Sequence, residues 1–192
     1  MDVNETQTKK VRNAKRMMLW FGIVSLTMTF AGLTSAYVIS KERPDWEGQL
    51  DLPEAFTWST LVIVLSSLCL VAASRTLQNQ QKDLTSVLVL STFGLGVVFF
   101  ILQINGFQEI IDQGYYFTGE SSGIKSSYIY ILVVLHLVHL AAGMISLSIV
   151  LVKQLAGKYT DSNPLGFELS STFWHFVDVL WVLLFVFLTF LR

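Results

Sequence analysis

The stretch Ser171–Arg192 reads STFWHFVDVLWVLLFVFLTFLR and is apolar over almost its whole length. A helix that crosses the hydrocarbon core of a bilayer needs about 20 mostly apolar residues, which this stretch supplies. It also carries His175 and Asp178, three residues apart, although ionisable side chains are costly at that depth. The stretch therefore predicts a transmembrane helix whose polar groups need an explanation.

The composition of the whole chain agrees with a membrane protein. Of 192 residues, 53% are hydrophobic and only 14% are charged, which is too few charges to cover the apolar surface of a soluble domain. With a net charge of −1, the chain has no excess of positive charge that would indicate nucleic-acid binding. The one cysteine, Cys69, lies in an apolar run, so neither a disulfide framework nor a thiolate metal site is expected.

Five segments are long and apolar enough to cross the bilayer, and none shows the alternating pattern of membrane strands. We expect an all-α, polytopic bundle of five transmembrane helices that forms a single membrane domain over residues 1–192. The first segment is too long for the apolar region of a signal peptide, so we expect it to be retained as a span. The expected spans are Met17–Ser40, Phe56–Ser74, Leu84–Ile104, Ser127–Val152 and Leu169–Leu191.

The distribution of Lys and Arg predicts the orientation, because cytoplasmic loops carry an excess of these residues. Nine of the 13 basic residues fall in the N-terminal tail, the second loop and the fourth loop, and four fall on the opposite side. We therefore expect the N-terminus inside and the C-terminus outside, as an odd number of helices requires.

The candidate functional residues are the few ionisable groups in or near the spans. His136 and His139 lie in LHLVHLAAG, His175 and Asp178 in the last span, and Glu109 after the third span in LQINGFQEI. Ionisable groups at membrane depth usually face protein or water and often have a function.

A haem between two of these histidines is geometrically awkward. Counting about 1.5 Å per residue, His175 lies roughly 9 Å from the inner boundary and His139 roughly 20 Å, with His136 farther still. Bis-histidine ligation needs two histidines at one depth on facing helices. A metal bound by His and Asp remains an alternative.

The interpretation that we favour is a hydrogen-bonded network between helices, because a buried polar group without a partner is costly. Asp178 lies about 13 Å from the inner boundary by the same rise, close to the depth of His139. We therefore expect His139 and Asp178 to pair, with His175 as the second choice. The indole N–H of Trp174 or Trp181 could donate to either group.

The last two spans resemble a known family. FWHFVDVLWVLLF (Phe173–Phe185) is similar to the last-helix signature of subunit III of the haem-copper oxidases, the cytochrome c oxidase subunit 3 family. LHLVHLAAG resembles the pattern of its preceding helix, with His136, His139 and Gly143 in matching places, and GFE matches at Gly166–Glu168. Leu19–Val38 is similar to an earlier helix of the family, so that the resemblance covers nearly the whole chain.

This resemblance implies a subunit without a redox centre of its own. Family members pack against the catalytic subunit I, which holds haem and copper and reduces O2 while pumping protons. They also bind phospholipid, support proton uptake and protect the catalytic subunit during turnover. By resemblance, the chain belongs in the bacterial cytoplasmic membrane, in a complex that takes electrons from cytochrome c or quinol. It would contain no cofactor itself and would contact subunit I, the other subunits of the respiratory complex and membrane lipids. The residues implied for a structural polar network are His136, His139, His175, Asp178, Trp174, Glu109 and Glu168.

The chain departs from the family pattern in two ways. Many members have seven helices, whereas this sequence predicts the five-helix form that occurs in bacterial oxidases. The membrane-embedded glutamate that follows a serine in the family falls on Leu26, after Ser25.

Two other functions remain as alternatives. The chain could be a small stand-alone proton-coupled transporter that uses Glu109, His139 and Asp178 as a proton relay. Transporters of this kind usually contain internal repeats or interrupted helices, and neither is evident in the sequence. A b-type cytochrome is the other alternative, and the unequal depths of the histidines disfavour it.

Overall fold

The structure is a computed structural model that describes residues 3–44, 46, 53–114, 123–157 and 165–190. Its described part contains helices and no strand, which confirms the expected all-α class. All five helices are long and apolar enough to cross a membrane. They are α1 (Val3–Ser40), α2 (Glu54–Gln78), α3 (Lys82–Asp112), α4 (Ile124–Leu155) and α5 (Leu165–Phe190).

The helices begin and end at other residues than the expected spans. The largest difference is at α1, which begins at Val3 instead of Met17, because the Lys, Arg, Gln and Ala residues before Met17 are good helix formers. Helix α3 runs on to Asp112, so Glu109 lies in its last turns and not after it. Hydropathy marks the part of a helix that lies in hydrocarbon, whereas the backbone hydrogen bonds continue beyond that part.

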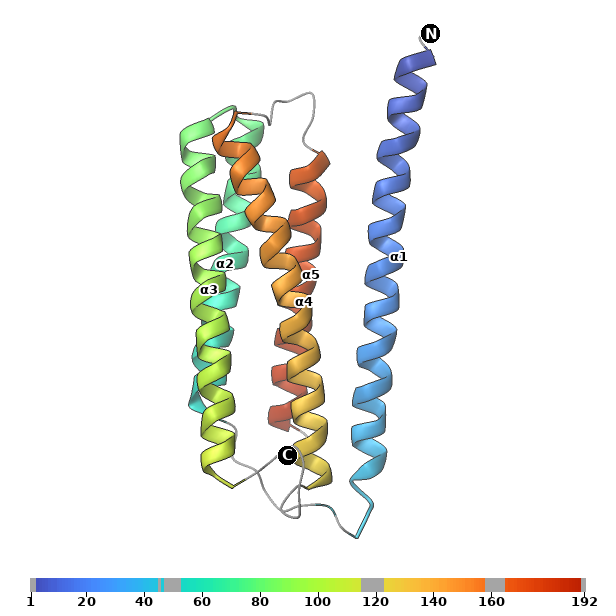
Figure 1. Ribbon diagram of the computed structural model, residues 1–192, viewed down its shortest axis with the longest axis vertical. Coiled ribbons are helices and arrows are strands. Elements are labelled where there is room, and N and C mark those ends of the chain that lie inside the picture. The colour runs from blue at the N-terminus through green and yellow to red at the C-terminus, as the bar shows by residue number, and fades with distance from the viewer. Residues whose placement is uncertain (1–2, 45, 47–52, 115–122, 158–164, 191–192) are drawn as a thin grey trace.

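Helices α2 to α5 form a four-helix bundle, and α1 lies along one side of it (Figure 1). Within the described residues, α2 contacts α3 and α5, α4 contacts α3 and α5, and α1 contacts α4 and α5 only. Helix α1 starts at one end of the bundle and α5 finishes at the other (Figure 1).

The centre of the bundle is built around Trp174 of α5, which is fully buried. Two glycines make room for its ring. A Cβ on Gly96 of α3 would lie 2.8 Å from Trp174 Cη2, and one on Gly143 of α4 would lie 3.2 Å from Trp174 Cε3. Because contacts this short leave little space for any side chain, the indole fills a slot between the backbones of α3 and α4.

The α2–α3 hairpin is also closely packed. The Oγ1 atoms of Thr76 and Thr85 are 2.9 Å apart, close to the connection between the helices. At the other end of the hairpin, a Cβ on Gly106 would lie 2.8 Å from Cδ1 of Phe56, a side chain that is 1% exposed. The Phe56 ring in turn packs edge-on against Trp181 of α5, with ring centroids 5.6 Å apart.

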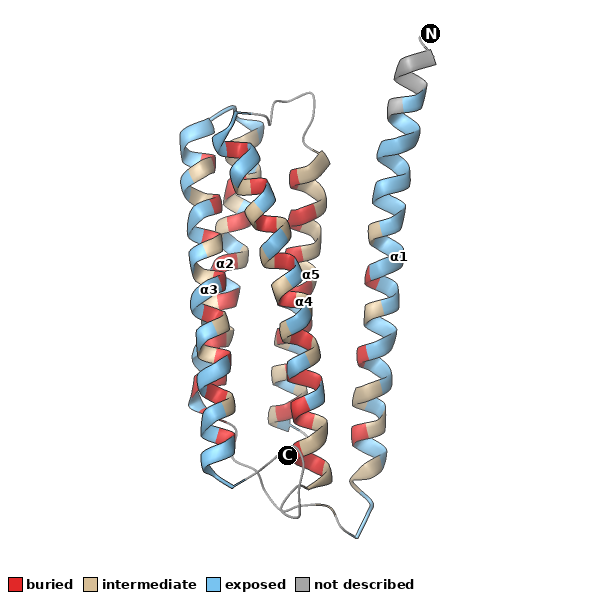
Figure 2. Ribbon diagram, in the orientation of Figure 1, coloured by how far each residue is buried: buried red, intermediate tan, exposed pale blue. Residues whose placement is uncertain are grey.

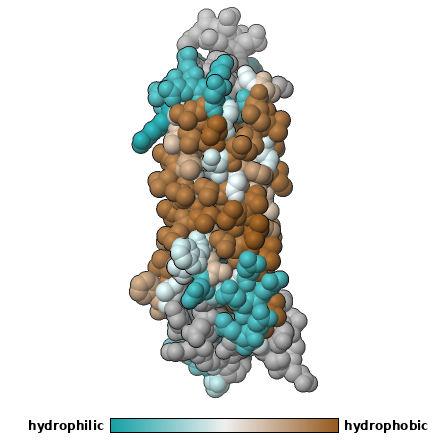
Figure 3. Space-filling model, turned by 90° about the vertical axis from the view of Figure 1, so that its left-hand side faces the viewer, coloured by the Kyte–Doolittle hydropathy of each residue, from teal (hydrophilic) through white to brown (hydrophobic). Residues whose placement is uncertain are grey.

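Helix α1 is the least buried of the five helices (Figure 2). Its buried apolar side chains are Ile23, Phe30 and Tyr37, which recur every seven residues and form one narrow stripe. Just before its apolar stretch, Arg16 forms an ion pair with Glu168 of α5. At its last residue, the Ser40 hydroxyl donates to the Tyr128 hydroxyl of α4 at 3.1 Å. Apolar side chains form a broad band around the middle of the visible face, between hydrophilic ends (Figure 3).

Helix α3 contains one glycine in close contact with a neighbouring side chain, Gly106, and one with free space around it, Gly94, and this difference allows a test of the packing. We expect Gly106→Ala to destabilise the protein, because the added methyl must displace Phe56, and overpacking a core typically costs about 1–3 kcal/mol. Heat-induced aggregation of the purified protein in mild detergent should therefore begin at a lower temperature.

Gly94→Ala is the matched control, because an added Cβ there meets nothing within 4 Å. Only helix propensity then changes, which favours Ala by up to about 1 kcal/mol. An equal aggregation temperature for the two variants would contradict the packing described here.

Candidate functional site

Three hydrogen bonds join α5 to α2 through hydroxyl groups of α2. Trp174 Nε1 donates to Ser66 Oγ at 3.2 Å, and Trp181 Nε1 donates to Thr60 Oγ1 at 3.0 Å. His175 Nδ1 lies 2.7 Å from Ser67 Oγ. The sequence allowed one of these indoles to donate to Asp178 or a histidine, but both donate to hydroxyl groups of α2 instead.

The hydroxyl residues of α2 are the functional residues that the sequence reasoning missed. Ser59-Thr60 and Ser66-Ser67 are seven residues apart, so they lie on one face of the helix two turns from each other. Ser59 also takes part, because its Oγ accepts a hydrogen bond from Gln103 Nε2 of α3 at 2.8 Å. The seven-residue spacing was the signal that could have identified this polar face.

The expected pair of His139 and Asp178 does not form. The Gly143–Trp174 contact sets the register of α4 and α5, and positions 139 and 178 lie one turn further along, at one depth. The two side chains face different helices, however. His139 Nδ1 is 2.7 Å from the Leu135 carbonyl oxygen, and its ring packs edge-on against Phe30 of α1, with centroids 6.0 Å apart. The sequence correctly placed the two residues at one depth, but they do not pair because their side chains point in different directions.

Asp178 faces α2 instead, where its carboxyl neighbours the Ser67 side chain. The residue is only 3% exposed. Neither carboxyl oxygen has a hydrogen bond of normal geometry to any described residue. Asp178 is therefore a buried carboxyl group whose nearest polar neighbour is a neutral hydroxyl.

His136 is fully buried between aromatic rings. Its ring centroid lies 5.1 Å from that of Trp181 and 6.1 Å from that of Phe99, the latter edge-on. Neither ring nitrogen has a hydrogen-bond partner among the described residues. Although His136 and His139 are one turn apart, the first points into the bundle and the second toward α1.

The three histidines thus have three different surroundings, and no two of them converge on a common point. Over the described ranges, no group of three or more His, Cys, Asp and Glu side chains is arranged to hold a metal ion.

The two glutamates singled out in the sequence lie apart from these groups. Glu109 is exposed near the end of α3. Glu168, near the start of α5, is about half exposed and pairs with Arg16 of α1. Leu26, which stands where the resembled family has a glutamate, is half-buried on α1.

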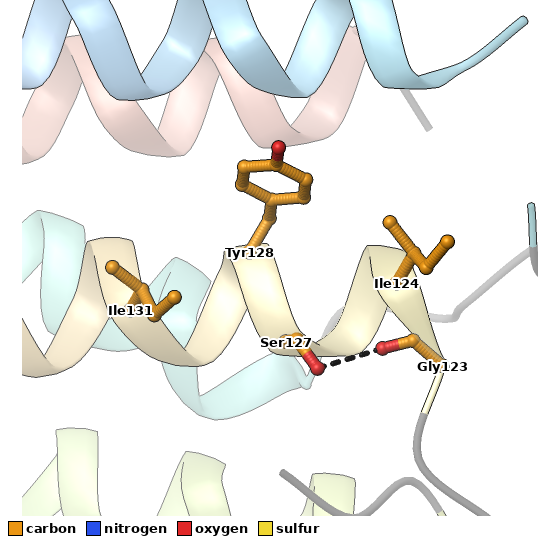
Figure 4. Close-up of a pocket in the computed structure, with 5 residues that line it drawn as sticks. All are labelled: Gly123, Ile124, Ser127, Tyr128 and Ile131. Atoms are coloured by element: carbon orange, nitrogen blue, oxygen red, sulfur yellow. Dashed lines mark hydrogen bonds between the residues drawn. The ribbon is translucent and has the colours of Figure 1, made fainter. Parts of the chain in front are cut away.

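Two pockets lie along α4. One is near the start of α4, and the Tyr128 ring that lines it points toward α1 (Figure 4).

The other pocket lies toward the opposite end of α4, where α1, α4 and α5 meet. It has apolar walls, with Lys153 and the hydroxyl groups of Ser146 and Ser170 as polar groups. Those two hydroxyls are hydrogen-bonded to each other at 3.0 Å. The residues that line the second pocket are Leu19, Ser146, Ile149, Val150, Lys153, Gly166, Leu169, Ser170 and Phe173.

Comparison with known proteins identifies the family of this chain. The family model for cytochrome c oxidase subunit III matches residues 2–191. Cytochrome c oxidase subunit 3 of Papio hamadryas is 30% identical over 189 residues, which cover 93% of this chain and 70% of the relative. The protein of the same name from Bacillus sp. (strain PS3) is 29% identical over 175 residues, which cover 89% of this chain and 83% of the relative. This multi-span membrane protein therefore belongs to the cytochrome c oxidase subunit III family, the non-catalytic third subunit of the haem-copper oxidase complexes.

Proposed function

We propose that this chain packs directly on the catalytic subunit I of an oxidase in the bacterial cytoplasmic membrane and supports O2 reduction without a redox centre of its own. The observation that carries this proposal is the family match over nearly the whole chain. The different surroundings of His136, His139 and His175 agree with it, because a haem or a metal needs ligands that converge. Haem and copper then lie in the partner subunits.

The proposal includes phospholipid as a second partner. The pocket between α1, α4 and α5 combines apolar walls, including Leu19, Ile149 and Phe173, with the ammonium group of Lys153. An acyl chain matches the apolar walls, and a phosphate group matches the ammonium. Lipid held there would fill the space between α1 and the bundle.

The polar residues serve as a structural network in this proposal. Trp174 and His175 hold α5 to α2, and Glu168 holds α5 to α1. We assign His136, His139, Asp178 and Glu109 to the same structural role and not to catalysis. A subunit held rigid in this way supports proton uptake and the stability of the catalytic subunit during turnover.

The alternative of a stand-alone proton-coupled transporter has less support. Its relay would need Glu109, His139 and Asp178 to lie along one path. Glu109 is exposed near one end of α3, His139 packs on α1, and Asp178 faces α2. A relay through these three groups would have to pass between helices at each step.

Purification in mild detergent tests the proposed function. Subunit I should co-purify with this chain, together with the absorption bands of haem and copper. When this subunit is removed, the remaining complex should reduce O2 at the same initial rate but inactivate after fewer turnovers. An isolated chain that transports protons without partner subunits would support the transporter instead.

The orientation of the chain gives a further prediction. From the excess of Lys and Arg, we expect the N-terminus in the cytoplasm. With Cys69 replaced by Ala, cysteines introduced by Asn4→Cys and Gly119→Cys can be labelled with an impermeant reagent in intact cells. The reagent should modify the cysteine at position 119 and not the one at position 4. Labelling at position 4 and not at position 119 would show that the N-terminus lies outside, contrary to this prediction.

The hydrogen bond from Trp174 to Ser66 gives a prediction about assembly. We expect Ser66→Ala to weaken the attachment of α5 to α2. Polar contacts between membrane helices are worth about 0.6 kcal/mol on average and seldom more than about 1.7 kcal/mol. Less of the subunit should therefore remain in the complex after a detergent wash, while the complexes that retain it reduce O2 at the normal initial rate.

Ser91→Ala is the matched control, because Ser91 is exposed on α3 and bonds only to the Val87 carbonyl of its own helix in the described structure. Equal retention of the two variants would refute the structural role of the Trp174–Ser66 bond. A lower initial rate with the subunit fully retained would instead give Ser66 a direct part in turnover.

A further inference from the structure

Asp178 is the only acidic residue within the five apolar spans of the sequence. Every other Asp and Glu lies in the tail, in a loop or near a helix end. On α3, for example, Asp83 and Asp112 are both exposed, one at each end of the helix. Asp178 stands alone as a carboxyl group at membrane depth.

Among the residues that the structure describes, no cation pairs with this carboxyl group. On α2, the polar neighbour of Asp178 is Ser67, and the only basic residue of that helix, Arg75, lies two turns away toward the helix end. On α1, no Asp, Glu, Lys or Arg occurs between Met17 and Ser40. On α3, the charged residues are confined to the two ends of the helix, away from the contacts of Gly96 and Phe99 with Trp174 and Trp181 of α5.

The histidines do not compensate it either. His139 on α4 bonds the Leu135 carbonyl and faces α1, while His136 is enclosed by Phe99 and Trp181. On α5 itself, His175 bonds Ser67. The ion pair of Arg16 with Glu168 joins α1 to α5 near the start of α5, more than two turns from Asp178.

An ionised carboxylate in this position would be a buried charge without a counter-ion, which proteins avoid by neutralising the group. We infer that Asp178 is a proton-binding site, occupied as a neutral carboxylic acid in the assembled complex, and that it exchanges its proton through Ser67 and His175. The inference goes beyond the structural role assigned above, and it does not depend on whether this subunit contacts subunit I.

Ser67 and His175 provide the exchange route because they link the buried acid to a more exposed group. Asp178 is 3% exposed, whereas Ser67 and His175 are both partly exposed. In the outward step, the Asp178 carboxyl group first turns into hydrogen-bonding geometry with Ser67. The acid then gives its proton to Ser67 Oγ as the Ser67 hydroxyl proton passes to His175 Nδ1, 2.7 Å away. His175 then carries the positive charge until Nε2 releases a proton, and Asp178 is a carboxylate until the reverse transfer restores it.

Infrared spectroscopy of the purified complex tests both parts of the inference. The wild-type spectrum should contain a carbonyl stretch of a protonated carboxylic acid, and Asp178→Asn should abolish it. After transfer to D2O, this band should shift as the acid exchanges. Ser67→Ala should slow that shift several-fold, because it removes the hydroxyl group between the acid and His175.

Ser91→Ala is the matched control, because this hydroxyl group is exposed on α3, donates to the Val87 carbonyl of its own helix and has no place in the route. Its exchange rate should equal that of the wild type. A spectrum that Asp178→Asn leaves unchanged would show an ionised carboxylate and overturn the inference. Equal exchange rates for Ser67→Ala and Ser91→Ala would overturn the route.

A second measurement covers the case in which Asp178→Asn prevents assembly. Wild-type complex grown with aspartate that carries ¹³C in its side-chain carboxyl should show the acid band at lower frequency. The band should disappear when this subunit is removed from the labelled complex. A labelled acid band that survives the removal belongs to another subunit, and the inference would then be wrong.

Discussion

The packing of Trp174 is the constraint on which the bundle depends. Its indole lies between Gly96 of α3 and Gly143 of α4, where a Cβ on either residue would meet the ring, and its N–H donates to Ser66 of α2. One side chain of α5 therefore contacts all three of the other bundle helices. A smaller side chain at position 174 would leave a cavity, and a larger one at Gly96 or Gly143 would push the helices apart.

The attachment of α1 differs from that of the other helices. It rests on the stripe of Ile23, Phe30 and Tyr37 and on the polar contacts of Arg16 and Ser40 on either side of that stripe, and most of its surface is exposed (Figure 2). Lipid and a partner helix are the two environments that can cover such an apolar surface in a membrane complex. The helix is thus placed to form the boundary between the bundle and its surroundings.

The lack of a carboxyl group at position 26 distinguishes this chain from the family pattern that it resembles. The family pattern has a glutamate in the first of these five helices, where this chain has Leu26, and the only acid at membrane depth is Asp178 on α5. Leu26 is half-buried on a loosely packed helix, whereas Asp178 is buried at the α2–α5 contact. Any role of a carboxyl group within the apolar spans of this chain therefore belongs to Asp178, in the tightly packed contact between α2 and α5.

The sequence by itself determined the number of helices, their membrane character and the family, because these follow from the length of apolar runs and from local motifs. It also placed His139 and Asp178 at one depth, since the rise per residue of a helix is constant. Only the tertiary structure decided that His139 turns to Phe30 and Asp178 to Ser67, and that the indoles donate to Ser66 and Thr60. The physical reason is that depth depends on one helix, whereas the direction of a side chain toward a partner depends on how each helix is rotated about its own axis. The close contacts at Gly96, Gly106 and Gly143 fix that rotation.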